Sequence, residues 1–335
     1  MNMEAFILGC GGMMPLPNRH LTSVLLRREG EVFLFDCGEG TQVSLRALNL
    51  KWKKISAIFI SHTHADHITG LPGMLMLSSQ VDRQDPLFLI GPPRLAEYVE
   101  ANRRALEMHI NYEIRVQEIQ DPSLPQDVFF GEGYRVRAFP LKHSRVCVGY
   151  SFIEDVRPGV FHPERAEAAQ VPRGALWAQL QRGEAVQNAV GEVVTADMVL
   201  GPPRRGRKFT FMTDTLPVAS AMPHIAGSDL LISEGMFDEA NRESAMAKKH
   251  MTAADAARLA RGAGGIKQMG LIHYSPRFTY GELKVLQREA REIFPETFLT
   301  RDHMTIKIPQ DDGVLDDSKV SDSSASRDVP DSQDL

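Results

Sequence analysis

A short cluster of metal-ligand residues constrains this chain more than any other feature. The stretch SHTHADH, residues 61–67, places His62, His64, Asp66 and His67 directly after the apolar run KISAIFI. Imidazole nitrogens and carboxylate oxygens are ligands of zinc, and catalytic zinc sites keep one position open for water. The spacing fits neither one face of a helix nor one face of a strand. It therefore predicts a tight loop at the carboxyl end of a strand, where α/β active sites lie.

Three further candidate ligands follow other predicted strands. His143 comes after YRVRAFPLK, Asp214 ends KFTFMTD, and His273 follows QMGLI. Taken alone, either histidine is more often a core or surface residue, and Asp214 fits a turn or helix cap. The four clustered residues have no packing explanation, and they are too few for a closed two-metal site. All seven candidates together are enough for two metals that share one bridging carboxylate.

Strands and helices alternate along the chain, which predicts an α/β fold. Strands are expected at MEAFILG, at the two segments joined at Glu29-Gly30, and at the apolar runs that precede the candidate ligands. SDLLISEG is a further predicted strand, ending near Glu234. Helices are expected at QVSLRALNL, at AEYVEANRRALEMH and at TAADAARLARGAG, the last starting near Thr252 or Asp255.

Two segments depart from this pattern. Residues 154–207 are broken by Pro and Gly and lack a clear core face, so they predict an insertion or protruding arm, although a long surface loop is an alternative. Residues 310–335 hold eight Asp against one Lys and one Arg, which predicts a disordered acidic tail. Without this tail the net charge of −5 becomes about +1. We therefore expect one folded domain over residues 1–309, with the arm inside it.

The composition also indicates where the protein resides. Cys10, Cys37 and Cys147 are odd in number and widely spaced, as expected of reduced thiols in a cytoplasmic protein. There is no apolar run of about 18 residues, and the start of the sequence does not look like a secretion signal. We expect no association with a membrane.

The sequence resembles the metallo-β-lactamase superfamily, whose signature is SHTHADH, and more closely the ribonuclease Z family of tRNA 3′-processing endonucleases. The resemblance covers nearly all of residues 3–309. It extends beyond the signature to further segments, namely FLFDCGEGTQ, KISAIFISHTHADHITGLPGML, PLKHS, GPPRRGRKFTFMTDT, HMTAADAARLA and HYSPRF.

This resemblance implies an αββα sandwich with two Zn²⁺ ions per subunit, although Mn²⁺ or another divalent metal is also compatible. It assigns His62, His64 and His143 to one zinc, Asp66, His67 and His273 to the other, and Asp214 to a bridge between them. It implies that Asp66 acts as the general base and that His250 helps the leaving group to depart. Asp36 and the turn at residues 38–40 are expected to orient the ligands.

The resemblance also implies a substrate and partners. The expected reaction removes the 3′ trailer of precursor tRNA and leaves a 3′-hydroxyl on the tRNA. The arm around VPRGALWAQLQRG resembles the family's tRNA-gripping exosite, which implies a homodimer. Candidate phosphate contacts are the exposed-looking cations Arg204, Arg205, Arg207, Lys208, Lys248 and Lys249.

The chain departs from the family pattern at two surfaces. The arm has Gly174-Ala175 in place of Gly-Pro, and Gln179 and Gln181 in place of lysines, which should weaken its RNA contacts. The first loop, PLPNRHLTS, lacks the family's Pro-x-Lys-x-Arg-Asn motif, which helps to reject substrates that already bear CCA. Two alternatives therefore stay open: a phosphodiesterase of the same fold that acts on a small diester or another RNA, and a catalytically inactive RNA-binding protein.

Overall fold

The computed structural model describes residues 2–81 and 83–310, and the acidic tail predicted at the C-terminus lies outside them apart from its first residue. The described residues form two compact units. The first comprises the chain up to Asp155 together with Arg207–Gln310, and the second comprises Val156–Gly206. The bounds of the second unit lie within two residues of the predicted insertion, 154–207.

The first unit contains two seven-stranded sheets, and the first of these is mixed. Its strand order is β16-β1-β2-β3-β4-β5-β6, parallel from β3 to β6 and antiparallel from β16 to β3. Positive φ angles at Glu29 and Gly30 make the predicted hairpin turn between β2 and β3. The strands are β1 (Met3–Gly9), β2 (Ser23–Arg28), β3 (Glu31–Phe35), β4 (Ile55–Phe59), β5 (Leu87–Gly91), β6 (Ile114–Glu118) and β16 (Thr305–Lys307).

The second sheet has the order β15-β14-β13-β12-β9-β8-β7. It is parallel from β12 to β15 and antiparallel from β7 to β12, so β8 runs in the same direction as β12. Its strands are β7 (Gln126–Gly131), β8 (Tyr134–Lys142), β9 (Val146–Glu154), β12 (Lys208–Met212), β13 (Leu230–Glu234), β14 (Met269–Ile272) and β15 (Thr297–Leu299).

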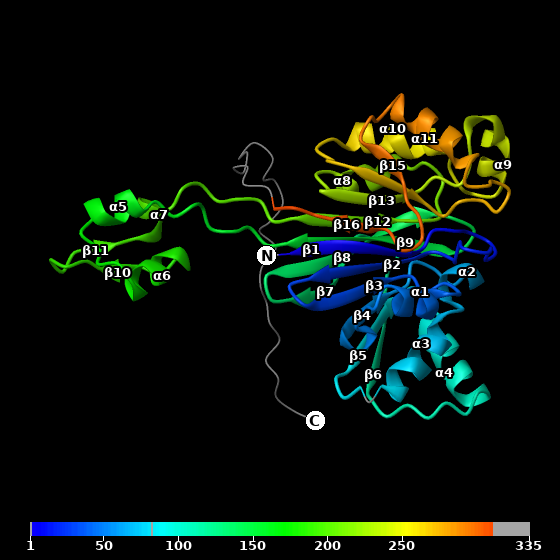
Figure 1. Cartoon of the computed structure of the whole chain (residues 1–335), viewed down its shortest axis with the longest axis horizontal. Coiled ribbons are helices and arrows are strands. Elements are labelled where there is room, and N and C mark those ends of the chain that lie inside the picture. Colours follow the sequence, from blue (N-terminus) through cyan, green and yellow to red (C-terminus); the bar gives the residue numbers. More distant parts are fainter. Residues whose placement is uncertain (1, 82, 311–335) are drawn as a thin grey trace. The chain divides into compact units, whose positions relative to one another are not determined.

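Helices cover the outer face of each sheet, which completes the expected αββα sandwich (Figure 1). The first sheet carries α1 (Thr41–Ala47), α2 (Ala65–Ile68), α3 (Leu71–Gln80) and α4 (Leu95–Ala105). The second carries α8 (Met222–Ile225), α9 (Arg242–Ala247), α10 (Ala253–Ala263) and α11 (Leu283–Arg291). Short 3₁₀ turns are η1 (Trp52–Lys54), η2 (Ala219–Ala221) and η3 (Glu239–Asn241).

Alternation along the strands divides the apolar residues between two layers. In β3, Phe33 and Phe35 belong to the core between the sheets, whereas Val32 and Leu34 belong to the core under the helices of the first sheet. The ring of Phe35 lies 5.2 Å from that of Phe209 in the opposite sheet. Each fully buried phenylalanine contributes about 1.5–3 kcal/mol of burial free energy. This aromatic layer fixes the two sheets against each other and so fixes the loops at their edges.

The second unit is built around a small apolar core of its own. Its elements are α5 (Pro163–Ala168), α6 (Ala175–Gln181), β10 (Val186–Gln187), β11 (Val193–Val194) and α7 (Ala196–Val199). Trp177 packs against Phe161, and its indole nitrogen donates to the carbonyl of Val171 at 3.0 Å. The buried residues are few and mostly small, namely Ala166, Val171, Leu180, Val186, Val194 and Val199.

The predicted elements are present, and helix α10 has the expected start. Thr252 and Asp255 form a capping box, in which the Thr252 side chain accepts from the Asp255 N–H and the Asp255 side chain from the Thr252 N–H. The strands β5, β6, β7, β9, β15 and β16 and the helices α2, α3, α8, α9 and α11 were not predicted from the sequence. Among residues 2–81 and 83–310, no helix has the length and apolar character needed to cross a bilayer.

Candidate active site

The seven predicted ligand side chains converge at one edge of the sandwich, because each follows the carboxyl end of a strand. His62, His64, Asp66 and His67 lie in the loop and short helix α2 after β4. The remaining three come from the opposite sheet, where His143 follows β8, Asp214 follows β12 and His273 follows β14. β8, β12 and β14 run in the same direction, so their carboxyl ends lie at one edge of the second sheet, and the packed sheets bring the loop after β4 against that edge. The site therefore depends on both sheets.

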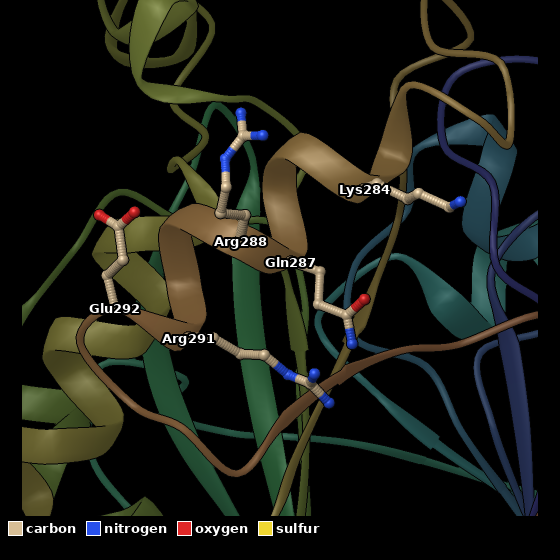
Figure 2. A pocket seen from close by; sticks show the side chains of 5 residues that line it. All are labelled: Lys284, Gln287, Arg288, Arg291 and Glu292. Carbon is tan, nitrogen blue, oxygen red and sulfur yellow. The ribbon is translucent and has the colours of Figure 1, made fainter.

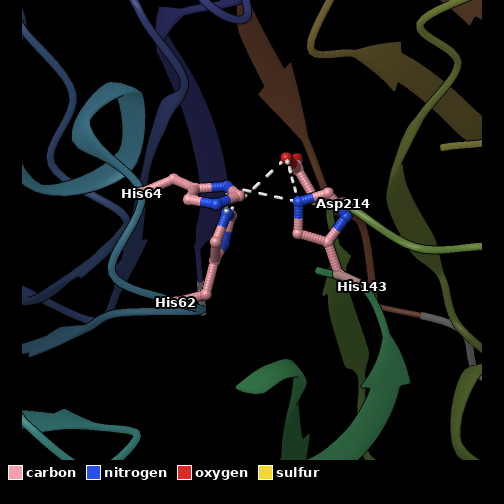
Figure 3. A group of neighbouring side chains, drawn as sticks. All are labelled: His62, His64, His143 and Asp214. Carbon is pink, nitrogen blue, oxygen red and sulfur yellow. Dashed lines mark hydrogen bonds and ion pairs between the residues drawn. The ribbon is translucent and has the colours of Figure 1, made fainter. Parts of the chain in front are cut away.

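Four of these side chains form a first group (Figure 3). His62 Nε2 lies 3.0 Å from His64 Nδ1, and His143 Nε2 lies 3.2 Å from the same His64 nitrogen. Asp214 Oδ2 lies 3.6 Å from both His62 Nε2 and His143 Nε2. Three ring nitrogens and one carboxylate oxygen thus surround a single point.

The other oxygen of Asp214 belongs to a second group. Asp214 Oδ1 lies 3.4 Å from His67 Nε2 and 3.2 Å from His273 Nε2. Asp66 Oδ2 lies 3.6 Å from His67 Nε2 and 3.2 Å from His273 Nε2. Asp214 therefore offers one oxygen to each group, which is the arrangement of a bridging carboxylate.

The spacing of these atoms fits metal ligands. Four ligands at about 2.0–2.1 Å from a tetrahedral zinc lie about 3.3 Å from one another. The separations in both groups range from 3.0 to 3.6 Å. Direct hydrogen bonding cannot account for all of them, because most of the ring nitrogens that face inward carry lone pairs.

The outer nitrogens of three imidazoles determine which nitrogen faces inward. His67 Nδ1 donates to Asp36 Oδ2 at 2.7 Å, and His143 Nδ1 donates to the carbonyl of Lys249 at 2.9 Å. His62 Nδ1 lies 3.0 Å from Ser61 Oγ, which itself donates to Asp36 Oδ2, so the hydroxyl accepts from His62. These contacts leave the Nε2 lone pairs of all three rings directed at the centre. Converging lone pairs repel one another unless a cation lies between them.

Electrostatics support the same conclusion. Burial, followed by the neighbouring imidazole of His67, lowers the pKa of His62, so this ring is neutral as a metal ligand must be. Burial opposes ionisation of Asp214, but His273 and His67 hold the pKa of its carboxyl well below the usual range. Burial lowers the pKa of His67, but Asp214, Asp66 and Asp36 outweigh it and raise that pKa well above its ordinary value. The centre thus favours positive charge at the position between these carboxylates.

Asp36 supports the ligand loop from behind, as the sequence predicted. Its buried carboxylate accepts the backbone N–H of Ser61 at 2.7 Å, in addition to the Ser61 hydroxyl and His67 Nδ1. The following turn has no room for a side chain at Gly38, where an added Cβ would meet Leu21 and the carbonyl of Asp66 at 2.6 Å. Asp36 and this turn therefore hold the ligand loop in position.

Strained backbone collects around the site. Met13, Asp36, Lys249 and His273 all have positive φ angles without being glycine, a conformation that costs about 1–3 kcal/mol. Met13 N–H donates to Asp66 Oδ2 at 2.7 Å. An added Cβ at Gly12 would lie 2.5 Å from the ring of His273, so only glycine fits there. The surrounding fold thus imposes the geometry of the ligands.

His250 lies beside the ligand cluster and forms a pair with Glu234. His250 Nδ1 is 3.2 Å from Glu234 Oε2, and His250 Nε2 faces Asp214 Oδ2 at 3.9 Å. Burial lowers the pKa of His250, but the carboxylate of Glu234 outweighs it and raises that pKa to about 9. Glu234 was predicted from the sequence only as the end of a strand. The pair gives His250 the protonated state that a proton donor needs.

The predicted RNA contacts divide into buried and exposed residues. The prediction for Arg207 was wrong, because its side chain is 1% exposed and is paired with Glu154 at 2.7 Å. The amino group of Lys208 already has a partner within the protein, since Nζ donates to the carbonyl of Ala226 at 2.8 Å. Only Gly206 separates Arg205 from Arg207, and nothing in the charge pattern distinguishes the two arginines. They differ in burial, because Arg207 is buried directly before β12 whereas Arg205 is half-buried.

The remaining four predicted contacts stay accessible to different degrees. Arg204 and Arg205 are half-buried, and Arg204 Nε donates to the carbonyl of Pro158 at 3.0 Å. Lys248 and Lys249 are exposed and immediately precede His250. Lys142 and Arg145, which flank His143, are also exposed, and the sequence analysis gave them no role. The accessible charge near the ligands thus lies around His143 and His250.

A second cationic surface lies on α11. Figure 2 shows a shallow hollow lined by Lys284, Gln287, Arg288, Arg291 and Glu292. The cationic side chains point in different directions, and Arg291 Nε donates to the carbonyl of Thr297 at 2.6 Å. They do not converge on a common point, so this hollow is not a second binding site.

Comparison with known proteins agrees with the geometry. The chain is 59% identical to ribonuclease Z of Treponema denticola over 312 residues, which covers 93% of this chain and all of that protein. It is 41% identical to ribonuclease Z of Borrelia hermsii, covering 94% of this chain and all of the relative. The family described as "Anti-Pycsar protein Apyc1" matches residues 3–152.

Solved structures show the same fold. The short form of human tRNase Z superimposes with a TM-score of 0.66 at 26% identity, covering 91% of this chain and 99% of that chain. The metallo-β-lactamase-fold protein YhfI of Bacillus subtilis superimposes with a TM-score of 0.64 at 18% identity, covering 92% of this chain and all of that chain. The second likeness concerns the fold alone.

Proposed function

The chain belongs to the ribonuclease Z family, a family of hydrolytic endoribonucleases, and from this premise we propose that it removes the 3′ trailer of precursor tRNA. The cut leaves a 3′-hydroxyl on the tRNA. The observation that carries this proposal is the convergence of seven ligand side chains on two adjacent points that share Asp214. Relatives that are 59% identical over nearly the whole chain bear the name ribonuclease Z.

We assign two divalent cations to this centre, with zinc as the best fit to the imidazole-rich donor set. His62, His64 and His143 would hold one, Asp66, His67 and His273 the other, and Asp214 both. Such ions supply Lewis acidity that activates water and neutralises charge on a phosphate. Mn²⁺ is compatible with the same ligands.

The protein's own groups would move the protons. Water attacks phosphorus, the new P–O bond forms, and Asp66 takes the proton released from the water. On the opposite side the bond from phosphorus to O3′ breaks, and His250 Nε2 gives its proton to O3′, which leaves as the 3′-hydroxyl. Glu234 stabilises the protonated form of His250 beforehand. In-line displacement requires the water beside Asp66 and the O3′ beside His250 to lie on opposite sides of the phosphorus.

We further propose a cytoplasmic homodimer in which the second unit grips tRNA as an exosite. Val43 on α1 is 58% exposed and lies with the half-buried Met76 and Leu77 of α3 along one hollow. An apolar strip of this kind suits an interface between two copies. In the second unit, Arg173 pairs with Glu167 and Arg182 with Glu184. This pairing supports the expectation of weakened RNA contacts in the arm.

A phosphodiesterase acting on a small diester or another RNA is the second candidate. The paired cations of the second unit favour it, because fewer charges remain free to bind tRNA. An inactive RNA-binding protein is less well supported, since all seven ligand positions are filled by suitable residues.

Cleavage of labelled precursor tRNA tests the proposal. Zinc-loaded protein should cut a trailer-bearing precursor at its 3′ end, and Asp66→Ala should not. A parallel precursor with an encoded CCA reports whether the altered first loop still rejects it. If zinc-loaded protein leaves both precursors uncut but turns over a chromogenic diester, the small-diester candidate replaces the tRNA proposal.

A further inference from the structure

Four exposed cations lie in the two segments that contain His143 and His250, and we call them the cationic rim: Lys142, Arg145, Lys248 and Lys249. Within the described part of the chain, none of their side chains forms an ion pair or hydrogen bond. Cations elsewhere on the first unit commonly have acidic partners, as Arg27 has Glu4 and Arg242 has Glu239. The rim is therefore a concentration of uncompensated positive charge at the mouth of the site.

The backbone that carries the rim is fixed. Lys142 N–H donates to Thr215 Oγ1 at 3.0 Å, and its carbonyl accepts from Leu216 N–H at 2.9 Å. These two residues follow Asp214 directly. The carbonyl of Lys249 accepts from His143 Nδ1 at 2.9 Å, which joins the segment before His250 to the turn between β8 and β9. Two separate segments are thus held together with their cations facing solvent.

We propose that the cationic rim binds the phosphates of the RNA strand on the 5′ side of the cut. This inference rests on the proposed function and specifies which part of the substrate the enzyme holds next to the scissile bond. Like charges on two segments that are hydrogen-bonded to each other repel one another, and a polyanion relieves that repulsion. A strand of RNA supplies a phosphate at every nucleotide, and its binding to Lys and Arg releases counterions.

The position of the proton donor decides which strand lies over the rim. O3′ belongs to the nucleotide on the 5′ side of the cut, and His250 gives its proton to that oxygen. Lys249 immediately precedes His250, and Lys142 and Arg145 flank His143, whose ring centroid is 5.0 Å from that of His250. The nucleotide that carries O3′ therefore leaves the site past the rim. The trailer, attached through O5′, departs elsewhere.

The test compares two double variants that remove equal charge. Lys142→Gln with Arg145→Gln removes two cations of the rim, and Lys284→Gln with Arg288→Gln removes two exposed cations of α11 (Figure 2). The readout is kcat/KM on precursor tRNA between about 50 and 200 mM salt. The rim variant should reduce the slope of log kcat/KM against log salt by about 1.5, since each phosphate contact contributes about 0.7–0.9. The α11 variant should keep the wild-type slope.

Inhibition by the two products tests the side of the cut. Mature tRNA without a trailer should inhibit the rim variant about 10-fold less strongly than the wild type, because contacts to that strand are lost. A free trailer oligonucleotide should inhibit both equally. Zinc content and melting temperature serve as folding checks, and Lys248→Gln with Lys249→Gln on the other segment should give the same result if the first variant loses zinc.

Each outcome has a distinct meaning. Equal slopes for the wild type and both rim variants would overturn the inference and leave these residues as a solvated surface. If only the trailer oligonucleotide inhibits the rim variant less strongly than the wild type, the rim binds the trailer, and the inferred strand is wrong. If wild-type protein cuts no precursor at all, the proposed function fails first, and the inference fails with it.

Discussion

The ligand cluster and the second unit differ in how their polar side chains are held. In the cluster, His62, His67 and His143 each have the outer nitrogen held by another group, and the backbone is strained where the geometry requires it. The second unit has a small core of short side chains, and it pairs Arg173 and Arg182 with its own acids at the surface. Substitutions in the cluster should therefore change the reaction by orders of magnitude, whereas changes in the second unit should adjust affinity.

Asp66→Ala should have the largest effect. It removes both a proposed ligand and the proposed proton acceptor, and loss of general base catalysis alone costs about 10²–10⁴-fold in rate. Cleavage of precursor tRNA should become undetectable, while the circular dichroism spectrum and tRNA affinity stay near those of the wild type. Loss of the folded-state circular dichroism spectrum would show that Asp66 is a structural residue. The contrast between the ligand cluster and the second unit would then not hold.

Asp36→Ala should reduce zinc affinity or kcat by about 10–100-fold, since partners of metal-bound histidines typically contribute that much. The change leaves His67 Nδ1 and the Ser61 N–H without their acceptor. Zinc competition with a chelating dye measures affinity, and kcat at saturating zinc separates orientation from binding. If zinc affinity and kcat are both unchanged, the ligand loop keeps its conformation without Asp36.

Removing the second unit should affect binding and leave the chemistry intact. The two points of the first unit between which the second unit is inserted are already adjacent, because Glu154 N–H donates to the carbonyl of Arg207 at 2.9 Å. A short Gly/Ser link between Asp155 and Arg207 should therefore close at little entropic cost. KM for precursor tRNA should rise about 10-fold or more, as phosphate contacts are lost, with kcat on a chromogenic diester retained. Loss of diester turnover would mean that the first unit needs the second to fold.

The ion pair between Glu154 and Arg207 should make the free energy of unfolding depend on pH. Burial opposes ionisation of Glu154, but Arg207 and Arg28 outweigh it and lower its pKa to about 2. Because the folded-state pKa is depressed, this contribution is present above the usual pKa of a glutamate, near 4.5, and is lost as pH falls towards about 2. Metal-free wild-type protein should lose several degrees of melting temperature between about pH 6 and pH 3. Glu154→Gln should be less stable at neutral pH and should show a flatter profile.

Deleting residues 310–335 should have the smallest effect. The segment is acidic, and nothing in the proposed site requires it. Activity on precursor tRNA at physiological salt should change less than about 2-fold, because screening limits the reach of its charge to about 8 Å. A tenfold change in rate would assign the tail a functional role.

The sequence predicted which seven side chains meet at one edge of the sandwich, because the chemistry of this cluster is local and unusual. HTHADH has no packing role, and the strands before His143, Asp214 and His273 are apolar enough to predict where those residues lie. Prediction was poorer where partners are distant along the chain. Burial of Arg207 depends on Glu154, 53 positions away in sequence. The pairing of Glu234 with His250 depends on the end of β13 meeting the loop between α9 and α10, which no local pattern shows.

Short edge strands and the rim were missed for a related reason. Strand β16 has only three residues and pairs with β1 at the other end of the chain. Lys142 and Arg145 look like ordinary surface charges in the sequence. Their significance comes from the contacts of Thr215 and Lys249 with the same turn, which only the folded chain shows.

The division of the ligands between the two sheets has a consequence for synthesis of the enzyme. Each proposed metal position takes residues from the loop after β4 and from strand ends that are translated much later, the last being His273. A growing chain cannot complete the first position until Asp214, after β12, has emerged, and it cannot complete the second until His273, after β14, has emerged and docked. A nuclease that assembled early would meet cellular RNA before its specificity surfaces existed. An unfinished chain therefore lacks the complete pair of positions, and metal held there would add to the free energy that holds the two halves of the sandwich together.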